Sequence, residues 1–171
     1  TGYTFTGWTG AGITNPGDAN ATVLMTEDRN VTATFQINSY SLIVSANGEG
    51  GAVSASAAHD YGTQATITAT PQTGYSFIGW SGEGIAAPNA STTTVDMTQD
   101  RNVSASFAID WHTLLASAGT GGTVTGSGTF DWNSSVPITA TPDAEYLFAG
   151  WSGTGITDLN SSLTSVSMTQ D

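Results

Sequence analysis

Hydrophobic residues alternate with hydroxyl-bearing and other polar residues in short runs along the whole chain, and no stretch of ten or more residues has helical spacing. Alternation with a period of two is typical of β-strands that are buried on one face. In the middle of the chain it predicts six short strands, at residues 42–46, 53–57, 64–70, 75–80, 94–97 and 103–109. We therefore expect an all-β protein.

The segments between these runs carry residues that favour turns. Residues 47–51 contain three glycines and predict a tight connection between the first two strands. A second turn is expected at residues 59–62. Pro71 ends the third strand, because proline has no backbone N–H to donate to a neighbouring strand. Each predicted strand is therefore short and bounded.

The fourth predicted strand carries a motif that contains Gly-Trp. Tyr75 and Phe77 are expected on one face of this strand, and Ile78 and Trp80 on the other. Gly79 leaves room for close backbone approach, or for a bulge that re-aims the tryptophan.

This Gly-Trp motif occurs three times, at residues 2–10, 74–82 and 145–153, with its tryptophans 72 and then 71 residues apart. A fixed period of this size indicates tandem copies of one fold. We predict tandem β-modules of about 72 residues with roughly six short strands each. The predicted segments are the C-terminal half of a first repeat at residues 1–38, a complete second repeat at 39–110, and a third repeat at 111–171 that lacks its last strand.

The charge balance excludes several partners. The net charge is −12, lysine and cysteine are absent, and Arg29 and Arg101 are the only arginines. Without a cluster of cations we expect no nucleic-acid binding and no electrostatic attachment to anionic lipid. The absence of cysteine excludes disulfides and thiolate metal sites. No apolar run approaches the ~18 residues that span a bilayer, so we expect no direct membrane insertion.

The aromatic residues of the repeated motifs are predicted to form the structural core of each module, because each large ring buries on the order of 150–250 Å². They are Tyr3, Phe5, Trp8, Phe35, Tyr75, Phe77, Trp80, Phe107, Tyr146, Phe148 and Trp151. The alternative is that exposed rings stack on sugars. In that hypothesis Trp80 and Trp151 form a glycan-binding surface.

Two charged pairs recur at the same turn, Asp28-Arg29 and Asp100-Arg101. We predict that each arginine forms an ion pair with a nearby acid across a module junction. His59 lies beside Asp60, but Phe130 takes its place in the third repeat, so we predict a turn residue.

No nucleophile, carboxylate pair or Asp-x-Asp-x-Asp loop recurs among the repeats. We therefore predict no catalytic residues, no metal site and no cofactor, and hence a protein that is not an enzyme.

The order of these motifs resembles the divergent internalin B-repeat family. Thr-x-Thr-Ala-Thr-Pro is followed by Gly-Tyr-x-Phe-x-Gly-Trp-Ser-Gly and then by Asp-Arg-Asn-Val-x-Ala-x-Phe. The resemblance covers essentially the whole chain, and Glu145 departs from it by replacing a glycine. It implies β-rich repeats in large exported bacterial or archaeal surface proteins, where they act as spacers, stalks or adhesin segments without catalytic residues.

We therefore expect a non-catalytic, extracellular structural segment at the cell surface: a stalk, a spacer or part of a filament. Short links at Asn38-Ser39 and Asp110-Trp111 are expected to limit bending, so that units in series make a stiff rod. The expected partners are neighbouring repeats and other copies of the chain that add a strand, since no lysine guards the strand edges. The partial repeats are expected to be completed by adjoining sequence or by a neighbouring subunit. The alternative is a carbohydrate-binding or adhesin module.

Overall fold

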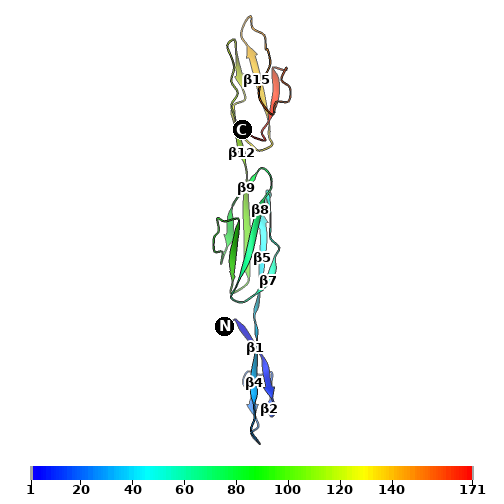
Figure 1. Cartoon of the computed structure of the whole chain (residues 1–171), viewed down its shortest axis with the longest axis vertical. Helices are drawn as coiled ribbons and strands as arrows, with labels where there is room; N and C mark the ends of the chain where they lie inside the picture. Colours follow the sequence, from blue (N-terminus) through cyan, green and yellow to red (C-terminus); the bar gives the residue numbers. More distant parts are fainter. Residues whose placement is uncertain (1, 171) are drawn as a thin grey trace. The chain divides into compact units, whose positions relative to one another are not determined.

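The computed structural model describes residues 2–170, and over that range it contains sixteen β-strands and no helix (Figure 1). The all-β class predicted from the alternating pattern is confirmed. Two compact units make up the chain, and strands β9 and β11 contribute residues to both. Unit 1 is Thr1–Asn47, Val53–Thr70 and Gly79–Ser106, and unit 2 is Gly48–Ala52, Pro71–Ile78 and Phe107–Asp171.

The second repeat contains two sheets. One has the strand order β7-β5-β11-β9, and the other has the order β10-β8-β6. The closing strand β11 runs parallel to β5, with Val103 opposite Val44. The strands are β5 (Ser39–Asn47), β6 (Gly51–Val53), β7 (Ala57–Asp60), β8 (Thr63–Pro71), β9 (Tyr75–Gly82), β10 (Thr92–Met97) and β11 (Arg101–Ile109).

The core of the second repeat follows the alternation seen in the sequence. Ile67 on β8 and Val95 and Met97 on β10 have no exposed surface. Burying one side chain of this size stabilises the fold by roughly 1.5–3 kcal/mol. The other buried hydrophobic residues of this repeat are Leu42, Val44, Ala65, Ala69, Trp80, Val103 and Ala105.

The second predicted strand is divided in the structure. Residues 53–57 were expected to form one strand. Instead, β6 ends at Val53 and β7 begins at Ala57, and these two strands belong to different sheets. Ser56 stabilises the crossing, because its hydroxyl accepts a hydrogen bond from the Val44 N–H at 2.9 Å. The repeat therefore has seven strands, and His59 lies in β7 opposite Tyr40 rather than in a turn.

The first repeat has two antiparallel pairs, β1 with β4 and β2 with β3. Its strands are β1 (Tyr3–Gly10), β2 (Ile13–Thr14), β3 (Thr22–Val23) and β4 (Val31–Ile37). By sequence position, β1 corresponds to β9 and β4 to β11.

The third repeat pairs β12 with β14 and forms a sheet in the order β13-β15-β16. These strands are β12 (Trp111–Leu114), β13 (Gly122–Thr125), β14 (Gly128–Asp131), β15 (Ser135–Pro142) and β16 (Leu163–Ser167). Its core contains Val136, Ile138, Val166 and Met168. Residues 146–153 form no strand.

Candidate functional site

Two neighbouring turn glycines of the second repeat each lie under an aromatic ring. In unit 2, the ring of Tyr75 lies on Gly50, and the ring of Phe107 lies on Gly51. A Cβ atom on either glycine would overlap the ring. Phe107 also makes an edge contact with Phe77, with ring centroids 6.0 Å apart. The turn glycines are therefore required for ring packing as well as for backbone shape.

A bulge turns the tryptophan toward the phenylalanine. In β1 the register with β4 shifts between Phe5 and Gly7, and the rings of Phe5 and Trp8 are 5.7 Å apart. The equivalent rings in the third repeat, Phe148 and Trp151, are 5.6 Å apart. Phe5 and Trp8 therefore share a face of β1, because one extra residue at a bulge reverses the alternation that follows it.

The prediction that Ile78 and Trp80 lie on one face of the strand is wrong, because the two side chains differ in burial. Trp80 is only 6% exposed, whereas Ile78 is 58% exposed. The indole N–H of Trp80 donates to the backbone carbonyl of Ala90 at 3.1 Å. Because its ring is covered, Trp80 offers no open face for a sugar.

The other aromatic residues that were predicted to form the core differ in how far their side chains are exposed. Tyr3, Phe35 and Tyr146 are more than half exposed and are not core residues here. The remaining rings are half-buried: Phe5, Trp8, Tyr75, Phe77, Phe107, Phe148 and Trp151.

Both arginines form ion pairs, each with a glutamate. Arg29 Nη1 lies 2.9 Å from Glu27 Oε1, and Arg101 Nη1 lies 3.1 Å from Glu83 Oε2. The arginine side chains are mostly covered, whereas the glutamates are exposed. Each pair lies within one repeat.

Each arginine thus pairs with a nearby acid, but the acid is Glu27 or Glu83 rather than Asp28 or Asp100, and neither pair crosses a junction between repeats. Neighbouring residues in an extended segment point to opposite sides, so the side chains of Asp100 and Arg101 diverge. Asp100 instead accepts a hydrogen bond from the Ser41 N–H at 2.8 Å. Arg101 also donates to the backbone carbonyl of Asp96 at 3.2 Å.

Consecutive repeats meet at the predicted links, Asn38 and Asp110, but the residues that contact these links were not predicted. In unit 1, the carbonyl of Gly2 accepts from the Asn38 N–H at 2.9 Å, and the Asn38 carbonyl accepts from the Tyr61 N–H at 2.8 Å. The Tyr61 ring lies on Gly2, where a Cβ would overlap it. Thr4 Oγ1 donates to Asn38 Oδ1 at 2.6 Å.

Unit 2 repeats the same joint with different residues. The Gly74 carbonyl accepts from the Asp110 N–H, and the Asp110 carbonyl accepts from the Trp132 N–H, both at 2.8 Å. The Trp132 ring lies on Gly74, and Ser76 Oγ donates to Asp110 Oδ1 at 2.5 Å. The sequence signal for this joint is an aromatic residue that follows an aspartate at the same place in two repeats, Tyr61 and Trp132.

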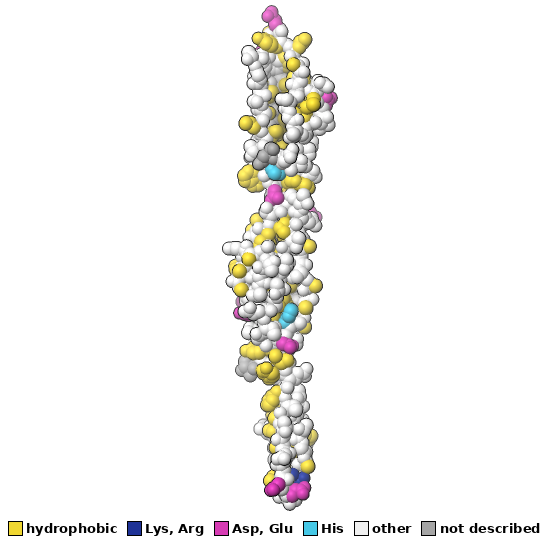
Figure 2. Space-filling model, viewed as in Figure 1, with side chains coloured by type: hydrophobic (Ala, Val, Ile, Leu, Met, Phe, Trp, Pro, Cys, Tyr) yellow, Lys and Arg dark blue, Asp and Glu magenta, His cyan; other side chains and the backbone are white. Residues whose placement is uncertain are grey.

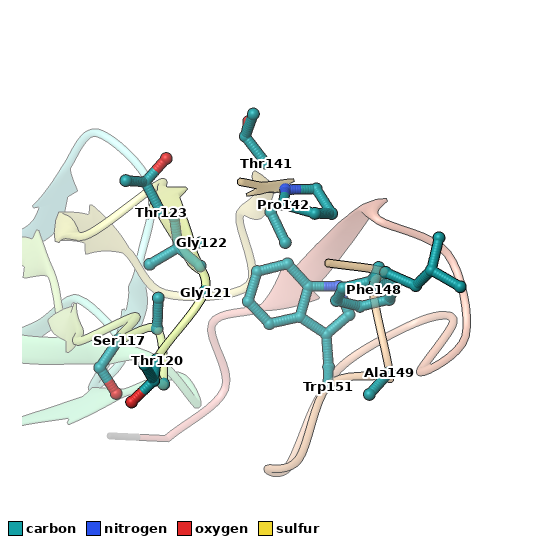
Figure 3. A pocket seen from close by; sticks show the side chains of 16 residues that line it. Ser117, Thr120, Gly121, Gly122, Thr123, Thr141, Pro142, Phe148, Ala149 and Trp151 are labelled. Carbon is teal, nitrogen blue, oxygen red and sulfur yellow. The ribbon is translucent and has the colours of Figure 1, made fainter. Parts of the chain in front are cut away.

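The third repeat has open hollows where the second repeat is filled. One, of about 240 Å³, is lined by Gly122, Pro142, Phe148 and Trp151 among others (Figure 3). Gly122 corresponds to Gly51, which carries the Phe107 ring in the second repeat. Another hollow, of about 500 Å³, is lined by residues 113–117 and by the core residues Ile138, Val166 and Met168. Both lie where a counterpart of β11 would pack.

Between residues 2 and 170 there is no group of three or more His, Cys, Asp or Glu residues placed to hold a metal ion. Over the same range no helix is long and apolar enough to cross a membrane. The face drawn in Figure 2 is largely uncharged, with hydrophobic side chains at scattered positions.

Comparison with known proteins gives one match. The family model described as the divergent InlB B-repeat domain matches three segments, residues 1–39, 40–110 and 112–171. No curated protein and no solved structure matches the chain.

Proposed function

Since the chain belongs to the divergent InlB B-repeat family, whose repeats are modules of bacterial surface proteins, we propose that it is a non-catalytic spacer segment outside the cell. The observation that carries this proposal is the joint. The same set of backbone hydrogen bonds and ring-on-glycine contacts occurs at Gly2 and again at Gly74. What recurs along this chain is thus a way of connecting modules, not a set of reactive groups.

The joint suits a spacer because it fixes a connection with little chain freedom. Asn38 and Asp110 each link two repeats, and each donates and accepts one backbone hydrogen bond at the joint. One such bond contributes about 0.5–1.5 kcal/mol net. A linker held at both its N–H and its C=O cannot sample the conformations of a free chain.

The test is a length series. Chains with no, one and two copies of residues 39–110 keep the order of the remaining residues, because Asn38 and Asp110 occupy equivalent positions. A spacer predicts that the largest dimension measured by small-angle X-ray scattering grows by the same increment with each copy. A compact particle, or an increment that shrinks with each copy, would contradict the proposal.

A carbohydrate-binding role is the second candidate, and one observation favours it. Trp151 and Phe148 line the open hollow of the third repeat beside several hydroxyl and glycine residues. A glycan bound there would protect the Trp151 indole from acrylamide quenching, and Trp151→Ala would abolish binding on a glycan array. Trp80→Phe is the matched control, because the Trp80 ring is covered.

A further inference from the structure

The third Gly-Trp motif differs from the first two at both side-chain positions of the joint. Glu145 replaces Gly2 and Gly74, and Leu147 replaces the hydroxyl residues Thr4 and Ser76. We infer that Glu145 and Leu147 close the surface that receives the aromatic turn residue of another repeat. The series of locked joints is therefore interrupted after the third repeat.

Glu145 blocks the position of the ring. Its φ is 68°, close to the 80° of Gly2 and the 81° of Gly74, so the backbone keeps the shape of the other joints. With the same backbone, the Glu145 Cβ points where a Cβ on Gly74 would point. At Gly74 that position is occupied by the Trp132 ring. A glutamate side chain and an aromatic ring cannot share this space.

Leu147 removes the second contact. Thr4 and Ser76 donate their hydroxyls to the side-chain oxygens of Asn38 and Asp110. Leucine has no donor, so the linker side chain of a following repeat would lose its partner. Leu147 is 92% exposed, so it does not replace the contact with packing inside its own repeat.

The backbone at Glu145 supports a specific role for this residue. Besides the glycines, the described residues with positive φ are Glu145 and two asparagines, Asn15 and Asn133. Asparagine tolerates the left-handed region, whereas glutamate has no local hydrogen bond that favours it. The third motif therefore holds the glycine conformation of the joint while presenting a side chain that excludes the partner.

This inference rests on the proposed spacer function for its meaning: locked joints hold neighbouring repeats, and a blocked joint leaves the next repeat free to move. The surface at Gly2 or Gly74 receives another repeat through a turn aromatic, Tyr61 or Trp132. The third Gly-Trp motif, with Glu145 and Leu147, does not bind such a repeat in this way.

The first experiment moves the third motif into the second joint. In the full chain, Gly74→Glu with Ser76→Leu is expected to raise amide hydrogen exchange at Asp110 and Trp132 by about tenfold or more, measured by NMR. Core amides of the second repeat should stay protected, which verifies folding. The matched control, Glu145→Gly with Leu147→Ser, should leave Asp110 and Trp132 unchanged. Continued protection of Trp132 in the first variant would overturn the inference.

The second experiment restores the joint, and it does not depend on the folding of that variant. Residues 101–171 are appended after Asp171, so that a second copy of Trp132 faces residue 145, and the original Trp132 is changed to Tyr. With Glu145 and Leu147 present, the indole of the added copy should be freely quenched by acrylamide. With Glu145→Gly and Leu147→Ser it should be protected. Protection in both chains would overturn the inference.

Different measurements test the spacer function and the inference about Glu145 and Leu147. Failure of the spacer function would appear as a missing increment in the scattering series. Failure of this inference would appear only at the exchanging amides and the added indole, because residues 39–110 contain neither Glu145 nor Leu147.

Discussion

At the scale of single residues, the chain uses glycine for the space it leaves as much as for its backbone freedom. Gly50 has a φ of 102° and carries the Tyr75 ring, whereas Gly48 has a φ of 86° with no atom near its missing Cβ. These two glycines lie in one turn, and comparing them separates the cost of backbone strain from the cost of displacing an aromatic ring. A substitution at Gly48 meets only backbone strain, but a substitution at Gly50 also displaces an aromatic ring.

We therefore predict that Gly50→Ala lowers the free energy of unfolding by more than Gly48→Ala. A left-handed alanine costs about 1–2 kcal/mol at either position. Overlap with the Tyr75 ring adds about 1–3 kcal/mol at Gly50 alone. Urea unfolding followed by circular dichroism measures both variants. Equal losses would mean that the ring moves aside without cost.

The arginines give a second prediction at this scale. Arg101 is mostly covered and donates to the Asp96 carbonyl, to the Thr98 hydroxyl and to Glu83, whose carboxylate is exposed. An exposed ion pair is worth about 0–1 kcal/mol, whereas hydrogen bonds from a charged donor contribute about 1.5–3 kcal/mol.

Arg101→Ala is therefore expected to lower the unfolding free energy by about 2 kcal/mol or more, and Glu83→Gln by less than about 1 kcal/mol. Thermal and urea unfolding of the two variants give the comparison. If Glu83→Gln proved as costly as Arg101→Ala, the carboxylate rather than the backbone contacts would be the main partner.

At the scale of elements, the sequence predicts strand positions well and strand partners poorly. Ala65, Ile67 and Ala69 alternate in sequence and are buried in β8 as expected. The division at residues 54–56 is not visible in the alternation, because a strand that changes sheets keeps its period of two. A bulge that re-aims the tryptophan was one of two alternatives at Gly79, and the equivalent position of the first motif has it, because the register of β1 with β4 shifts between Phe5 and Gly7.

The joint shows the same limit at the candidate site. Gly2 and Gly74 can be recognised as recurring glycines, but their function depends on rings that lie far away in sequence, Tyr61 and Trp132. The local sequence pattern shows the residue types and their spacing. It does not show which distant residue packs on a given glycine. The partner of Arg101 shows the same limit, since Glu83 reaches it only after the chain folds back, whereas Glu27 is close to Arg29 in sequence.

The open side of the third repeat leads to a prediction about strand addition. In the second repeat, β11 lies between β5 and β9, with Val103 opposite Val44. The residue equivalent to Val44 is Ala116, which borders one of the hollows. A strand with the sequence of residues 101–110 has the pattern that fits this position, because its Phe107 would fill the space above Gly122.

A synthetic peptide of residues 101–110 is therefore expected to bind the full chain at residues 114–118 and 147–151. Amide shifts and slowed exchange at these positions, measured by NMR, would report binding. The same peptide with Phe107→Ala is the control, and it should bind more weakly because it lacks the ring. Shifts confined to the first repeat would place the acceptor surface elsewhere.

At the scale of the whole molecule, the excess of acidic side chains is the feature that affects stability. Fourteen acidic and two basic side chains leave a net charge of −12 over 171 residues. Lysine is absent and Arg29 and Arg101 are the only arginines, so most carboxylates have no fixed cation to pair with. Like charges that remain unpaired repel one another in the folded state, and the unfolded chain relieves this repulsion by expanding.

Salt should therefore stabilise the protein at neutral pH. Raising sodium chloride from about 0.01 M to 0.15 M shortens the screening length from ~30 Å to ~8 Å and weakens the repulsion between distant carboxylates. We expect the melting temperature to rise over this range at pH 7. Near the sequence isoelectric point, about pH 4.1, the net charge vanishes and the same salt series should leave the melting temperature nearly constant. A fall in melting temperature with salt at pH 7 would mean that the two arginine pairs outweigh the excess of acidic charge.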